Sequence, residues 1–164
     1  MDLSDIGNYG ELSLLSFVAS LHPSESCGSN GLPLTPNSIS ILGNSQILKT
    51  MVHPHLCRFL DCLRGKHERL IFVSEHFRGR PSLVGPHWKG SVKSILEGLI
   101  YLNDRGVIHG NLREENILEC PQGTLKLTHY GLSHATDYGL LVAFPIGDPR
   151  LTAPEVFAMG KFGG

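Results

Sequence analysis

Short apolar runs separated by polar and glycine-rich stretches predict that the chain begins with β-strands. Residues 12–18, 56–63 and 70–74 are the clearest runs, and a polar turn at residues 64–67 joins the last two. Further on, alternating residues over 124–128 follow a Pro-Gln-Gly turn, which predicts a hairpin with Ile117-Leu118. The predicted strands therefore fall into two groups with helical sequence between them.

Helical periodicity is found in two places. The first predicted helix has Thr35 as its N-cap and Pro36 in its first turn, and it ends before His53-Pro54. Its apolar positions are Ile39, Leu42, Ile47, Leu48 and Met51. The second helix covers residues 91–103, where apolar residues recur along one face, and Gly106 follows its C-terminus. This apolar stripe consists of Val92, Ile95, Leu96, Leu99 and Leu102.

Composition and charge exclude several functional classes. Hydrophobic residues make up 41% of the chain and charged residues 18%, which is typical of a globular domain. The net charge of −1 offers no basic surface for nucleic acid. The longest apolar stretch, residues 12–21, is too short to cross a bilayer, and the acidic N-terminus is unlike a signal peptide. We therefore expect a cytoplasmic protein with no membrane insertion and no nucleic-acid partner.

The cysteines and histidines do not form a known metal motif. Of the four cysteines, Cys57 and Cys62 are close in sequence, but no second pair completes a zinc site. The nine histidines are scattered and contain no His-Glu-x-x-His pattern. We expect reduced thiols and no bound metal.

The most informative stretch is residues 107–118, Val-Ile-His-Gly-Asn-Leu-Arg-Glu-Glu-Asn-Ile-Leu. It has the shape of a protein-kinase catalytic loop, His-Arg-Asp-Leu-x-x-x-Asn, with two residues changed. Gly110 stands at the arginine position and Asn111 at the position of the catalytic aspartate. His129-Tyr130-Gly131 then lies at the Asp-Phe-Gly position, and Ala153-Pro154-Glu155 matches the end of an activation segment.

Over about residues 35–160 the chain thus resembles a protein kinase domain. The resemblance implies an α+β, protein-kinase-like fold. A small β-rich N-lobe would cover residues 1–77, and residues 78–164 would form only the beginning of the helical C-lobe, through the Ala-Pro-Glu motif.

Three segments narrow the resemblance to one family. Residues 27–39, 64–70 and 144–147 are similar to the N-terminal kinase-like domain of TBC domain-containing protein kinase-like proteins. In that family a TBC domain, of the Rab-GTPase-activating type, and a rhodanese-like domain follow. The chain contains neither, so we expect a truncated kinase-like domain.

The residues that should hold ATP are missing at their expected positions. Phosphoryl transfer needs bound phosphates, a held metal and an oriented acceptor hydroxyl. The phosphate-binding lysine should precede the first helix, yet no lysine or arginine occurs before Lys49. The glutamate that pairs with this lysine falls near Asn44 by spacing from His53. The resemblance therefore implies that this ion pair has neither half.

The catalytic base and the metal ligands are also altered. Asn111 has a neutral amide that cannot take a proton, and losing a positioned general base costs roughly 10²- to 10⁴-fold in rate. His129 replaces the carboxylate that would hold magnesium, an ion that prefers hard oxygen ligands. Asn116 matches the family's second metal ligand, and we expect it to bond to loop backbone instead. The expected structural motif residues are His109, Gly131, Ala153, Pro154 and Glu155.

The sequence therefore predicts a pseudokinase module without ATP or magnesium. It would serve as an interaction or scaffold domain, with unidentified protein partners, in a TBC-type, Rab-regulating protein of membrane trafficking and growth signalling. The alternative is a divergent protein kinase that binds ATP and weakly phosphorylates serine or threonine. A third hypothesis is a fragment that is stable only with the rest of the C-lobe or with a partner.

Overall fold

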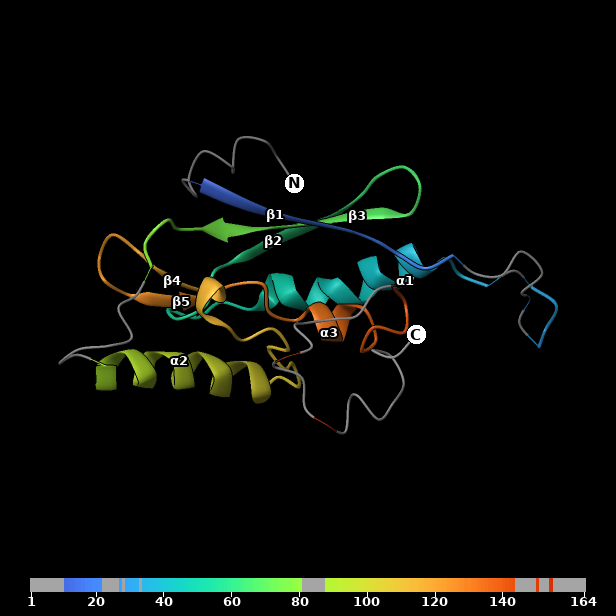
Figure 1. The fold of residues 1–164 in the computed structure, drawn as a ribbon. Helices are drawn as coiled ribbons and strands as arrows, with labels where there is room; N and C mark the ends of the chain where they lie inside the picture. Colours follow the sequence, from blue (N-terminus) through green and yellow to red (C-terminus); the bar gives the residue numbers. More distant parts are fainter. Residues whose placement is uncertain are drawn as a thin grey trace.

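The computed structural model describes residues 11–21, 27, 29–32, 34–80, 88–143, 150 and 154. Within these residues, a three-stranded sheet and a two-stranded hairpin combine with helices in an α+β arrangement. Figure 1 shows the sheet on one side of the molecule and the long helix α2 on the other, with α1, α3 and the hairpin between them. No helix among the described residues is long and apolar enough to cross a membrane.

The three-stranded sheet is antiparallel and has the order β1-β3-β2. Its strands are β1 (Glu11–Val18), β2 (Phe59–Arg64) and β3 (Arg69–His76). The register of β1 on β3 places Ser13 opposite Ser74. The turn from β2 to β3 has φ of 56° at both His67 and Glu68, as in the tight turns whose twist suits antiparallel strands. All three predicted strands are present in this sheet.

Aromatic side chains fill the inner face of the sheet. Phe72 on β3 lies edge-on to Phe17 on β1 and to Phe59 on β2, and both pairs of ring centroids are 5.1 Å apart. Edge-to-face packing of this kind adds about 0.5–1.5 kcal/mol per pair beyond simple burial. These rings belong to a core to which the helical segment after residue 36 also contributes.

That helical segment differs from the prediction, because it is divided. α1 (Asn37–Asn44) is followed by a 3-10 segment, η2 (Ser45–Thr50). The side chains of Ser45 and Gln46 both donate to the carbonyl of Leu42 at 2.8 Å, so they compete for the acceptor that the helix backbone would use. Pro36, rather than Thr35, occupies the N-cap position, and no side-chain hydrogen bond caps the helix.

The change of helix type also changes which apolar residues are buried. Leu48 and Met51 are buried as predicted, at 0% and 1% exposure. Ile39 and Ile47, also predicted to face the core, are 38% and 36% exposed, and Ile41 is buried in their place. A 3-10 turn has three residues, not 3.6, so a single helical period cannot describe both halves.

The predicted hairpin is confirmed, and it joins the sheet to the rest of the chain. It consists of β4 (Ile117–Glu119) and β5 (Leu125–Leu127). The predicted strand at residues 56–63 begins later than expected, at Phe59. Its first residues instead flank Leu127, because the Cys57 amide donates to the Leu127 carbonyl at 2.8 Å. A half-buried ion pair, Lys126 to Glu75 at 3.1 Å, adds a second link between β5 and β3.

The second predicted helix, α2 (Trp88–Asn103), is confirmed, and its predicted apolar stripe faces the core in part. Leu102 is fully buried, and Ile95 and Leu99 pack against the core. Val92 and Leu96, also in the stripe, are 41% and 50% exposed. The helix approaches the hairpin closely at Gly98, where an added Cβ would lie 3.2 Å from Leu127, so the buried face is shifted toward Gly98.

Two substitutions on α2 test this face. Leu102→Ala should lower the free energy of unfolding by about 2–5 kcal/mol, because it leaves a cavity in the core. Leu96→Ala is the matched control on the same helix, and it should change that free energy by less than about 1 kcal/mol, since its side chain is half exposed. Urea denaturation of both variants gives the comparison. Equal losses would mean that Leu96 is packed as tightly as Leu102, which would contradict the exposed position of Leu96.

Candidate functional site

The described site residues lie on the segment that leads into the hairpin and on the segment that follows it. The catalytic-loop segment, residues 107–113, leads into the short 3-10 helix η3 (Glu114–Asn116) and strand β4. Thr128 and His129 directly follow β5, and the amide of Thr128 donates to the carbonyl of Asn116 at 2.9 Å. The hairpin thus brings His129 beside the loop that holds Asn111, as the kinase resemblance implies.

His129 is held by hydrogen bonds at both ring nitrogens. Its Nε2 lies 2.9 Å from Oγ of Ser13 on β1, and its Nδ1 lies 3.0 Å from Oδ1 of Asn116. Nδ2 of Asn116 in turn donates to the carbonyl of Asn111 at 2.7 Å. The predicted contact of Asn116 with loop backbone is therefore seen, and His129 and Asn111 are linked through it.

The surroundings of His129 disfavour positive charge. Burial lowers the pKa of its imidazole, and electrostatic interaction with His76 and Arg113 lowers it further. Its two hydrogen bonds also leave neither ring nitrogen available to a metal. Magnesium requires hard oxygen ligands and usually one or two carboxylates, whereas this position has an imidazole and an amide. These residues therefore do not fit a magnesium ion, and no cluster of three or more metal-ligating side chains occurs in the described part of the chain.

His109 lies in the interior beneath the same loop. It is 5% exposed, and its Nδ1 accepts a hydrogen bond from the amide of Asn111 at 3.2 Å. Its Nε2 is buried without a hydrogen-bond partner among the described residues. Burial, and secondarily the neighbouring His129, lowers the pKa of His109 to about 4. The neutral imidazole thus braces the loop from below.

Gly110 is required by close packing as well as by its backbone conformation. Its φ is +71°, in the left-handed region. An added Cβ would overlap Oγ of Ser133, which lies on the short helix α3 (Leu132–Ala135). The space that a side chain at residue 110 would need, where an ordinary kinase has arginine, is therefore occupied by Ser133.

The helix α3 also contacts the segment that carries Asn44. The side-chain amide of Asn44 donates to the carbonyl of Ala135 at 3.2 Å. At Gly131, with φ of +74°, an added Cβ would overlap the side chain of Leu48. Asn44 thus lies away from the Ser13–His129 contact and serves to attach α1 to α3.

Sequence reasoning missed one residue of this site. Ser13 lies on the strand that precedes the first helix, and its hydroxyl lies 2.9 Å from Nε2 of His129. A serine in a weak strand gave no sign of this contact, because the contact depends on how the folded strands are placed. Tyr130, which the motif did identify, has a buried hydroxyl that donates to the carbonyl of Cys57 at 2.9 Å.

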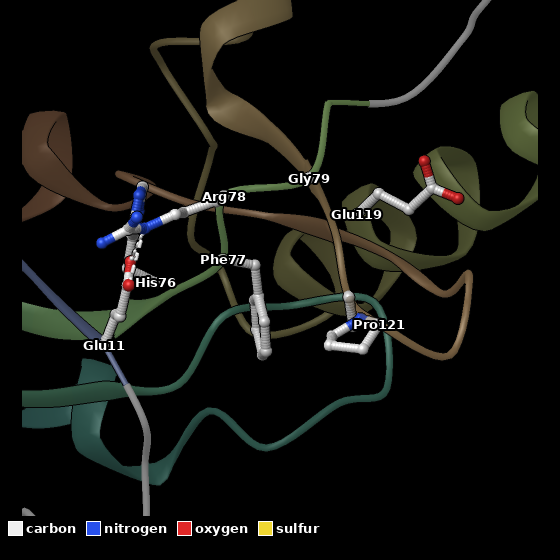
Figure 2. Close-up of a pocket in the computed structure, with 8 residues that line it drawn as sticks. Glu11, His76, Phe77, Arg78, Gly79, Glu119 and Pro121 are labelled. Atoms are coloured by element: carbon white, nitrogen blue, oxygen red, sulfur yellow. Dashed lines mark hydrogen bonds and ion pairs between the residues drawn. The ribbon is translucent and has the colours of Figure 1, made fainter.

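A cavity of about 440 Å³ lies between the end of β3 and the hairpin. Figure 2 shows Arg78 and Glu11 pointing toward one another at one side of it, with Phe77 between this pair and Pro121. The Arg78 Nε lies 2.6 Å from the Glu11 carboxylate, and this hydrogen bond lowers the pKa of Glu11. None of the predicted site residues lines this cavity.

The predicted activation-segment motif is mostly outside the described residues. Ala153 and Glu155 lie outside them, whereas Pro154 is described and exposed. Their structural roles stay predictions, as does the boundary between residues 77 and 78.

Comparison with known proteins agrees with the motif order and the fold. The sequence profile of the family described as Protein kinase domain matches residues 35–163. The chain belongs to the protein kinase domain family. This membership confirms the predicted α+β, kinase-like fold, in which the strand-rich part precedes α2.

The kinase-like domain has relatives of the predicted type. The TBC domain-containing protein kinase-like protein of Mus musculus is 48% identical over 158 residues, and that of Homo sapiens is 48% identical over 160 residues. These alignments cover 92% and 93% of this chain but 18% of each relative, so the chain spans about a fifth of their length. CBL-interacting serine/threonine-protein kinase 1 of Arabidopsis thaliana is 30% identical over 140 residues, which is 77% of this chain and 31% of that protein.

Buried His109 makes stability depend on pH. Its pKa is about 4 in the folded chain and 6.5 in the unfolded one, so the unfolded state binds the proton first as the pH falls. Stability is complete above pH 6.5, and about 3 kcal/mol should be lost between pH 6.5 and 4. Urea unfolding at a series of pH values measures this loss. The His109→Gln variant should lose stability less steeply over that window, and an unchanged slope would rule out His109 as the source.

The Gly110–Ser133 contact can be tested against a second glycine with the same φ. Gly106 also has φ of +71°, but an added Cβ there meets nothing within 4 Å. Gly106→Ala should therefore cost about 1–2 kcal/mol of unfolding free energy from backbone strain alone. Gly110→Ala should cost a further 1–3 kcal/mol or so from overpacking, part of which Ser133→Gly restores. Equal losses at both glycines in thermal denaturation would show that Ser133 does not restrict this position.

Proposed function

We propose that this kinase-like domain is a pseudokinase module that binds protein partners and does not transfer phosphate. The observation that carries the proposal is the position of His129, whose two ring nitrogens are bonded to Ser13 and Asn116. A kinase needs a metal-holding carboxylate at the position of His129, and it needs a phosphate-binding lysine before the first helix. Here a neutral serine and an imidazole bond to each other.

The neighbouring positions support the same conclusion. The Asn111 amide cannot act as a general base, and its backbone carbonyl is occupied by Asn116. Asn44 donates to the carbonyl of Ala135, so its side chain makes a structural contact between α1 and α3. We accordingly propose that the domain uses neither ATP nor magnesium, and that its role is that of an interaction or scaffold domain.

The family context extends this proposal to the cellular level. The mouse and human relatives are named for a TBC domain beside their kinase-like part. We propose that this domain likewise works in the cytoplasm within a TBC-type, Rab-regulating protein. Any effect on a Rab GTPase would then belong to the TBC domain, and the kinase-like part would contribute protein contacts.

Nucleotide binding and phosphotransfer provide the test. ATP with magnesium at 100 times its Kd would stabilise the folded chain by about 2.7 kcal/mol, so a binder would show a clear rise in Tm. We expect no magnesium-dependent rise and no transfer of labelled phosphate to a generic serine/threonine substrate. Asn111→Ala is the control, because activity from a contaminating kinase survives this substitution.

Two results would contradict the proposal. Stabilisation that requires both ATP and magnesium would show a nucleotide site, and phosphotransfer that Asn111→Ala abolishes would show a divergent kinase. For the binding role, partners captured by chemical crosslinking should be the same for the wild type and for Asn111→Ala. Loss of those partners in this variant alone would tie binding to the catalytic loop.

A further inference from the structure

We propose that Ser13, His129 and Asn116 form a hydrogen-bonded lock that fastens the sheet to the catalytic loop. Ser13 comes from β1, His129 follows β5, and Asn116 ends η3. The first of these contacts joins residues 116 positions apart in the chain. The lock therefore links three segments that are otherwise held in separate elements.

The Asn111 carbonyl, which Asn116 contacts, determines the direction of every hydrogen bond in the lock. The Asn111 carbonyl can only accept, so the group of Asn116 that faces it is the NH₂ group. The Oδ1 atom of Asn116 then faces His129 and can only accept, so Nδ1 of His129 carries the hydrogen. Nε2 is left with a lone pair, and it accepts from the Ser13 hydroxyl. One arrangement of hydrogens therefore satisfies the whole chain with neutral groups.

Burial makes the lock costly to open. Asn116 is 3% exposed, so its amide would lose its partners without gaining water. His129 has φ of 56°, a conformation that non-glycine residues adopt rarely and that the surrounding contacts must hold. Side-chain networks of this kind contribute more together than single deletions suggest.

The position of the lock on β1 gives it a mechanical role. Beyond its other end, at Ala19 and Ser20, the strand is attached by a bridge from Ala19 to Val142 and by the Ser20 amide, which donates to the Leu141 carbonyl at 2.9 Å. Ser13 supplies an attachment nearer the start of the strand. β1 is thus attached to segments outside its own sheet both near its start, through Ser13, and just beyond its end.

A double-mutant cycle tests the lock on the full 164-residue chain. Ser13→Ala and His129→Phe each remove one side of the first contact, and the strain at residue 129 cancels in the cycle. Together they should shift the unfolding equilibrium at least about threefold less than the product of the single effects. The control pairs His129→Phe with Ser16→Ala, an exposed serine on the same strand, and these two effects should multiply. Multiplying effects for Ser13 and His129 as well would overturn the proposal.

A measurement on the unmodified chain covers the case in which His129→Phe does not fold. The ¹⁵N chemical shifts of the His129 ring report which nitrogen carries the hydrogen. We expect the hydrogen on Nδ1 at pH 8, and Ser13→Ala should move the Nε2 signal while leaving Nδ1 protonated. A hydrogen on Nε2 would overturn the proposal. The lock uses the same His129 contacts as the proposed function, but neither experiment measures phosphotransfer or partner binding, so failure of the lock is distinguishable from failure of the proposed function.

Discussion

The backbone of Leu127 is the junction on which the structure depends. Its amide donates to the carbonyl of His55 at 2.9 Å, and its carbonyl accepts from the amide of Cys57 at 2.8 Å. Its side chain is 1% exposed and lies against Gly98 of α2. One residue thus connects the segment entering the sheet, the hairpin and the long helix. The two residues that follow it, Thr128 and His129, are placed beside the catalytic loop as a direct result.

Neutral hydrogen bonds occupy the positions at which a kinase concentrates charge. His129 bonds to both Ser13 and Asn116, and burial, followed by electrostatic interaction with His76 and Arg113, lowers the pKa of its imidazole. A carboxylate in a half-buried site needs a cation beside it, since few waters reach it. A neutral hydrogen-bonded network needs no counter-charge. The same residues can therefore contribute to folding at all times.

The sequence predicted the elements better than it predicted their faces. The strands, the hairpin and α2 were predictable because apolar periods and turn residues are local properties. The burial of Ile41 in place of Ile39 was not, because it depends on a helix that tightens after Leu42 through the side chains of Ser45 and Gln46. On α2 the stripe was right for Ile95, Leu99 and Leu102 but not for Val92 and Leu96, because the close approach at Gly98 leaves no trace in an apolar pattern.

The residues of the candidate site were likewise predictable only in part. Motif order identified Asn111, Asn116 and His129, since spacing along the chain survives even where the chemistry has changed. Ser13 could not be identified, because its role depends on strand register and on a partner 116 residues away. A missing lysine can be read from the sequence, whereas only the folded chain shows that Ser13 contacts His129.

The contact between Gly110 and Ser133 also has a meaning for how such a domain can change over time. An arginine at residue 110 would meet Ser133 at its first side-chain atom, before its charge could reach any phosphate. An arginine at this position would therefore require a change at Ser133 as well, because the Oγ of Ser133 occupies the place of the new Cβ. The φ of +71° would in addition strain any side chain at residue 110. Residues 110 and 133 are thus coupled through space, and a substitution at one of them limits which residues the other can accept.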